Sequence, residues 1–170
     1  MSGIPRPPFR TALVRALALA AVLPAAMLAG AGPAAAQANG AIANPRSGLC
    51  MDTNGDPGVV NTVLQVRDCG DFTGQVWSFD AASGRVSNMS SGLCVDTNGD
   101  PGVVNTALLL RSCGDFTGQF WTYDGATAHI SNVHSGLCVD TAGDPGVVNT
   151  GLVLRSCGDG IGQRWTVPAA

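Results

Sequence analysis

The chain has 170 residues and a formal net charge of −3, with nine arginines, twelve aspartates and neither lysine nor glutamate. Every aspartate lies after residue 50, so the C-terminal part of the chain is more acidic than the whole. An acidic surface repels phosphate groups, and we therefore expect no nucleic acid partner and no attraction to anionic membranes.

Residues 1–36 have the pattern of a secretory signal peptide. Three arginines are followed by a long apolar run that ends in three alanines. Pro24 interrupts the run, so we expect no membrane insertion. Cleavage after residue 36, with Ala38 as the alternative, would release residues 37–170 outside the cell. That length suits one domain.

The rest of the chain is a tandem repeat with a period of 44 residues. The segment DTNGDPGVVNT at 52–62 returns unchanged at 96–106 and with a single change at 140–150. Cysteines and tryptophans recur with the same spacing, and a fixed period of this size indicates a repeat architecture. The three repeats are expected at about 40–83, 84–127 and 128–170.

Each repeat is predicted to hold four short strands. The segments VLQVRDC, ALLLRSC and GLVLRSC alternate with a period of two, and GDPG is typical of a tight turn. One strand precedes the first cysteine of each repeat, and its first copy begins near Ala41. The third repeat lacks its last strand, so we expect this N-terminal copy to complete it. The result is an all-β ring of twelve strands without a free edge.

The six cysteines are predicted to form disulfides, because an even number in an exported chain is typical of them. Pairing inside each repeat keeps the repeats equivalent. A zinc site is the alternative, but no CxxC occurs and the histidines do not repeat, so we expect no metal. The predicted pairs are Cys50–Cys69, Cys94–Cys113 and Cys138–Cys157.

A Gly-Leu-Cys-x-Asp strand, a second cysteine 19 residues after the first and a Gln-x-Trp occur three times each. In this combination they resemble the ricin-B-type lectin domain, which also serves as the family 13 carbohydrate-binding module. The resemblance covers residues 41–167. It implies a β-trefoil that binds galactose, xylose or related sugars at up to three shallow sites. It also places the Gln-x-Trp tryptophans in the core: Trp77, Trp121 and Trp165.

The resemblance further implies which residues contact the sugar. The aspartate two residues after each first cysteine bridges sugar hydroxyls in the family, and a carboxylate suits this role because it accepts from two hydroxyls. The alternative is that these aspartates hold the backbone of the following turn. Gln65 occupies a second polar position in the first repeat only. The carbohydrate-binding set is thus Asp52, Asp96, Asp140, Gln65, Gln75, Gln119 and Gln163.

Two family contacts are missing from all three repeats. An arginine replaces the aromatic ring on which the sugar stacks, and a glycine replaces an asparagine just before the Gln-x-Trp. Either the exposed rings of Phe72 and Phe116 take over the stacking, or the arginines bind a carboxylate of an acidic glycan. The arginines also have a structural alternative, in which they pair with Asp71, Asp115 and Asp159. The arginines concerned are Arg67, Arg111 and Arg155.

Other chemistry has less support in the sequence. DTNGD spaces oxygen ligands as calcium loops do, but Pro57 stands where such loops need glycine, and Val63 where they need glutamate. The sequence has no glutamate that could act as a catalytic acid. The only histidines, His129 and His134, do not repeat. We therefore predict a secreted, extracellular monomer that binds carbohydrate without catalysis or cofactor. The alternatives are a trefoil that serves as a protein-interaction scaffold or inhibitor, and a calcium-dependent surface module.

Overall fold

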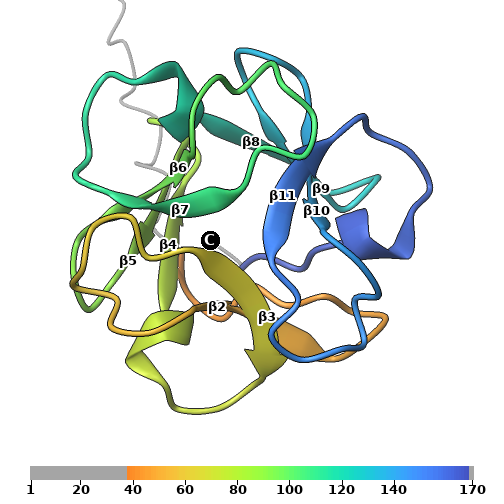
Figure 1. Ribbon diagram of the computed structural model, residues 1–170, viewed down its shortest axis with the longest axis horizontal. Helices are drawn as coiled ribbons and strands as arrows, with labels where there is room; N and C mark the ends of the chain where they lie inside the picture. Colours follow the sequence, from red (N-terminus) through yellow and green to blue (C-terminus); the bar gives the residue numbers. More distant parts are fainter. Residues whose placement is uncertain (1–37, 169–170) are drawn as a thin grey trace, which may run out of the picture. The chain divides into compact units, whose positions relative to one another are not determined.

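The computed structural model describes residues 38–168. The predicted signal peptide lies outside the described residues. These residues form strands and three short 3-10 helices (Figure 1). The first five strands are β1 (Ala38–Gly40), β2 (Leu49–Thr53), β3 (Leu64–Asp68), β4 (Trp77–Asp80) and β5 (Arg85–Asn88). The later strands are β6 (Cys94–Thr97), β7 (Leu108–Arg111), β8 (Trp121–Asp124), β9 (His129–Asn132), β10 (Cys138–Thr141) and β11 (Leu152–Arg155).

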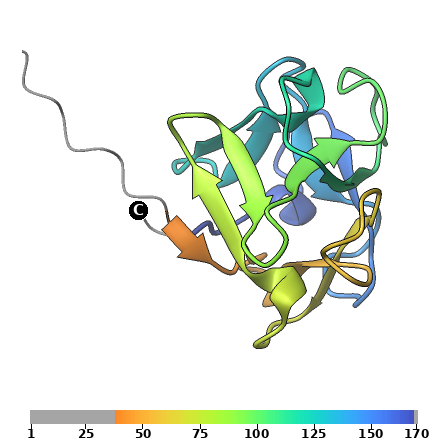
Figure 2. The ribbon, with the colours of Figure 1, turned by 90° about the vertical axis from the view of Figure 1, so that its left-hand side faces the viewer.

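All strand pairs are antiparallel, and all join neighbours in chain order except β1, which pairs with β4. One sheet has the order β1-β4-β5-β6-β7, a second the order β11-β10-β9-β8, and β2 pairs with β3 alone. The β4–β5 hairpin extends beside β1 (Figure 2). Each 3-10 helix ends at the glutamine of a Gln-x-Trp motif, and the three are η1 (Thr73–Gln75), η2 (Thr117–Gln119) and η3 (Ile161–Gln163). No helix in residues 38–168 is long and apolar enough to span a membrane.

The predicted closure of the ring is confirmed at Ala43. Its N–H donates to the carbonyl of Thr166 at 3.1 Å, and the N–H of Thr166 donates back at 2.8 Å. The all-β, threefold fold is therefore confirmed, but the closing pair is a single bridge rather than two full strands. Pro45 and Pro168 follow within two residues, and proline has no N–H to extend a ladder.

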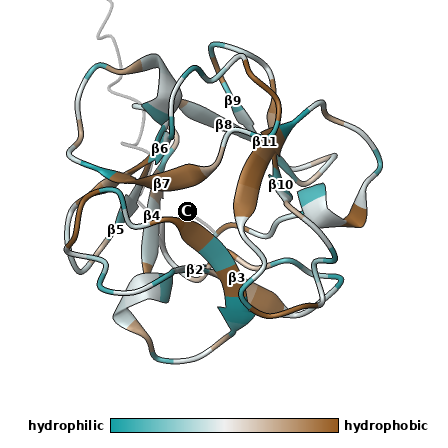
Figure 3. Ribbon diagram, in the orientation of Figure 1, coloured by the Kyte–Doolittle hydropathy of each residue, from teal (hydrophilic) through white to brown (hydrophobic). Residues whose placement is uncertain are grey.

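The core lies where the repeats meet. Strands β3, β7 and β11 surround the centre of the view in Figure 1, joined by isolated bridges such as Val63–Leu109 and Ala107–Val153. Their inward residues are apolar, and Figure 3 shows this hydrophobic band most clearly on β7 and β11. The predicted burial of the tryptophans is confirmed, and each indole Nε1–H donates to a backbone carbonyl. These three rings are the largest fully buried side chains: Trp77, Trp121 and Trp165.

Candidate functional site

In each repeat the aspartate after the first cysteine forms a buried pair with the glutamine of Gln-x-Trp. In the second repeat, Asp96 Oδ2 accepts from Gln119 Nε2 at 3.0 Å, and Oδ1 accepts from the N–H of Thr97 at 2.7 Å. The same glutamine also donates to the carbonyl of Ser112 and accepts from the N–H of Gly114. Asp96 is only 3% exposed, so its carboxylate serves as an internal acceptor.

The first and third repeats reproduce this pair. Asp52 accepts from Gln75 and Asp140 from Gln163, both at 3.0 Å. All four side chains are buried. The structure thus brings together the aspartates and glutamines expected at a sugar site, but it places them beneath the surface.

Gly118 explains this burial. A Cβ at this position would overlap Asp96 Oδ1 and Thr97 Oγ1, because the η2 turn lies directly over the aspartate. Gly74 and Gly162 make the same approach in the other repeats. The position at which the family often has an asparagine therefore has no room for a side chain. The turn therefore covers the Oδ1 side of the carboxylate.

Gln65 lies opposite Asp52 in the β2–β3 ladder and is also buried. Its counterparts, Leu109 and Val153, are buried apolar residues. The second polar contact expected in the first repeat is therefore part of the interior.

The three arginines differ in their partners. Arg67 Nη1 lies 3.6 Å from Asp52 Oδ2, and Arg155 Nη1 lies 3.9 Å from Asp140 Oδ2. Arg111 has no such ion pair among the described residues, and its Nε donates to Asn61 Oδ1 at 3.3 Å.

The alternative pairing of these arginines with the loop aspartates is not formed. Arg85, which comes from β5, lies 3.3 Å from Asp115, and Arg164 lies 3.1 Å from Asp159. The loop aspartates of the second and third repeats therefore already have another arginine as their partner.

The phenylalanines of the CGDFTGQ loops are exposed, as the sequence suggested. Phe116 is 59% exposed, and its ring lies against Gly114, where a Cβ would collide with the ring edge. Phe72 lies in the same way against Gly70, with the guanidinium of Arg67 5.5 Å from its ring centre. Gly160 takes this place in the third repeat, and the exposed Ile161 follows it.

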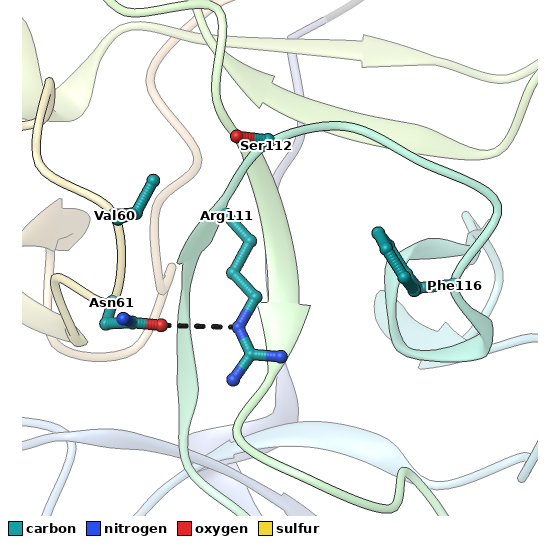
Figure 4. Close-up of a pocket in the computed structure, with 5 residues that line it drawn as sticks. All are labelled: Val60, Asn61, Arg111, Ser112 and Phe116. Atoms are coloured by element: carbon teal, nitrogen blue, oxygen red, sulfur yellow. Dashed lines mark hydrogen bonds between the residues drawn. The ribbon is translucent and has the colours of Figure 1, made fainter.

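A hollow of about 270 Å³ lies at the junction of the first and second repeats (Figure 4). Phe116 stands on one side of Arg111, and Asn61 lies on the other side and accepts its Nε–H. The hollow combines an aromatic ring, an apolar side chain, a hydroxyl and guanidinium donors. Five residues line it: Val60, Asn61, Arg111, Ser112 and Phe116.

Val60 and Asn61 were missed as site residues by the sequence analysis. They belong to the repeated DTNGDPGVVNT segment, which lies against a strand of the next repeat. The sequence signal that could have identified this surface is the pair of valines within each copy of a turn segment. In the structure all six of these valines are exposed. Exposed apolar side chains beside a hollow are typical of binding surfaces.

The aspartates of the possible calcium loop hold their own backbone. Asp56 Oδ1 accepts from the N–H of Gly58 at 2.8 Å, as expected for a structural turn. Among the described residues, the one group with metal-ligand types in close proximity is His129, Cys138 and Cys157. Those two sulfurs are joined to each other, and all three predicted disulfides are confirmed.

A family model for the ricin-type beta-trefoil lectin domain matches residues 38–167. The chain belongs to this family. A comparison with curated proteins found no match.

Solved structures of other ricin-type and trefoil proteins share the fold. The designed threefold-symmetric protein ThreeFoil superposes with a TM-score of 0.71 at 16% identity, over 78% of this chain and 99% of its own. The hemolytic lectin CEL-III gives 0.65 at 26% identity, over 78% of this chain and 30% of its own. The C-half of an earthworm R-type lectin, solved with GalNAc, gives 0.65 at 12% identity, over 78% and 99%.

Proposed function

We propose that this ricin-type domain is a secreted, non-catalytic carbohydrate-binding monomer whose sugars bind in the clefts between repeats. The observation that carries the proposal is the hollow in which the exposed ring of Phe116 accompanies the donors of Arg111. The apolar C–H face of a sugar packs on an aromatic ring, while its hydroxyl oxygens accept from N–H groups. Membership of the lectin family supports the same ligand class.

Secretion is supported by three disulfides within 134 residues of acidic chain after the predicted leader. Disulfides persist in oxidising compartments. The threefold arrangement repeats the cleft positions at each junction, so we expect up to three weak sites that act together on clustered or polymeric glycans.

The test is retention of residues 37–170 on a broad glycan array and on immobilised polysaccharides. The double variant Phe72→Ala/Phe116→Ala is expected to lose retention without loss of stability, because both rings are exposed. Met89→Ala is the matched control, since it removes an exposed apolar side chain from a different turn. Undiminished binding by the double variant would contradict sugar binding in the clefts. A folded wild type that is not retained at all would contradict carbohydrate binding itself.

The buried aspartates support a second candidate, a trefoil that presents its loops to another protein. The carboxylates that the family uses for sugar are engaged inside this chain. Alanine variants of Asp52, Asp96 or Asp140 do not separate the two candidates, because they would also leave buried donors without acceptors. Retention on the glycan array does separate them, since only the lectin requires it.

A further inference from the structure

The positions that line the hollow differ in charge among the three junctions, although the repeats are nearly identical in sequence. Ser112 lines the cleft between the first and second repeats, whereas Asp68 occupies the equivalent position of the first repeat. The third repeat keeps the serine, as Ser156, but has Gly160 in place of the ring. Only the cleft at Ser112 therefore combines a neutral polar residue with an aromatic ring.

The guanidinium groups of the three equivalent arginines also differ in their partners. Both Nη groups of Arg111 are without a partner within residues 38–168, while its Nε is held by Asn61. In contrast, Arg67 faces the carboxylate of Asp52. Arg155 faces Asp140 and also donates Nη2 to the carbonyl of Ala142 at 3.3 Å. Arg155 Nε is held by Asn105 in the same way, so Arg111 differs from the other two arginines in the absence of Nη partners among the described residues.

The loop aspartates strengthen the contrast. Asp115 stands next to Phe116, and its charge is paired with Arg85 at 3.3 Å. Its counterpart Asp71, next to Phe72, has no ion pair among the described residues. An anion entering the cleft of Arg67 would therefore meet the unpaired charge of Asp71 as well as that of Asp68.

We propose that the cleft at the junction of the first and second repeats is the dominant site and that it accepts a carboxylate-bearing sugar, a hexuronic acid residue. The inference rests on the proposed function and names its ligand class. The carboxylate accepts from the two Nη groups of Arg111, which match its planar geometry. The C–H face of the ring lies on Phe116, and the hydroxyl of Ser112 bonds a sugar hydroxyl.

The test is calorimetric titration of residues 37–170 with an oligomer of galacturonic acid and with its carboxyl methyl ester. The ester replaces each carboxylate by a neutral group that carries one additional methyl. The acid is expected to bind at least about tenfold more tightly, because a hydrogen bond to a charged group is stronger than one to a neutral group. Its affinity should also fall with added salt.

Variants then locate the site. Arg111→Gln should weaken acid binding by about tenfold or more, to the level of the ester. Arg67→Gln and Arg155→Gln remove the same charge from the other clefts and should weaken it by less than about twofold if Arg111 dominates. Ser112→Asp copies the charge of the first repeat and should abolish the preference for the acid, whereas the neutral Ser112→Asn should retain it.

Several results would overturn the inference. Equal binding of acid and ester by the wild type would contradict recognition of a carboxylate by Arg111. So would an Arg111→Gln variant that binds the acid normally, and neither result would contradict carbohydrate binding itself. Equal losses of affinity in all three arginine variants would contradict the proposal that this cleft is the dominant site. Circular dichroism of each variant verifies the fold. Failure of the proposed function has a different signature, since the folded wild type would then be retained by no glycan, acidic or neutral.

Discussion

The backbone N–H of Asn61 donates a 2.7 Å hydrogen bond to the carbonyl oxygen of Leu110, which joins the turn of the first repeat to a strand of the second. Asn105 makes the same bond to Leu154, and Asn149 closes the cycle by bonding Val66. Each of these asparagines has a φ of +65° to +67°. The repeated segment thus hydrogen-bonds each repeat to the next, which explains why the chain contains it three times.

Asn61→Ala tests the left-handed backbone conformation at this contact between repeats. Alanine in the left-handed region costs about 1–2 kcal/mol, so the free energy of unfolding in urea should fall by that amount. Asn61→Gly is the control, because glycine adopts the same backbone conformation without strain. Equal losses in the two variants would show that the left-handed conformation is not what selects the residue.

The sequence was sufficient to predict contacts that follow from the repeat itself. The period of 44 identified equivalent cysteines and a closing N-terminal strand, and the family resemblance placed the tryptophans in the core; the disulfides, the buried rings and the closure of the ring agree with these predictions. The pairing of Asn61 with Leu110 was not, because nothing local specifies which strand of another repeat a turn will meet. The cleft at Arg111 is built on that pairing and was therefore missed.

The burial of Asp96 was also beyond the sequence. The motif shows a carboxylate two residues after a cysteine, but its exposure depends on a turn more than twenty residues later. Gly118 was noted as a missing contact, whereas its physical role is to let that turn lie on the carboxylate. A departure from a family pattern can thus indicate close packing rather than only the loss of a contact.

Gly118→Ala tests this close approach. A methyl group would overlap Asp96 and Thr97, and overpacking of this kind costs about 1–3 kcal/mol of unfolding free energy. Gly158→Ala is the matched control in a loop of the third repeat, because a Cβ there meets nothing within 4 Å. We expect the control to keep or slightly raise the stability measured by urea denaturation. An equal loss at both positions would contradict the packing of η2 on Asp96.

The three disulfides should contribute equally. Each joins cysteines 19 residues apart with Cα atoms separated by 5.1 Å, so each closes an equivalent loop. Replacing Cys94 and Cys113 together by alanine should cost about 3 kcal/mol on the chain-entropy model. The matching double variants in the other repeats should lose the same amount in urea unfolding. Unequal losses would show that the repeats are not energetically equivalent.

Asp80 provides a prediction about pH. The Ser83 hydroxyl, at 2.6 Å, is the main cause that lowers the pKa of Asp80 below its ordinary value of 3.8, and the N–H of Ala82 adds to this effect. Ser83→Ala should therefore raise the pKa of Asp80 in an NMR titration of the side-chain carboxyl carbon. The pKa of Asp124, lowered in the same way by Thr127, is the internal control and should not change.

The sign of the stability effect follows from the lowered pKa of Asp80. A depressed folded-state pKa stabilises the fold above the ordinary pKa, and this contribution is lost as the pH falls through the folded value. The difference in unfolding free energy between Ser83→Ala and the wild type should therefore be larger at neutral pH than in acid. A difference that stayed constant across the titration of Asp80 would mean that the hydroxyl acts through packing and not through the carboxylate.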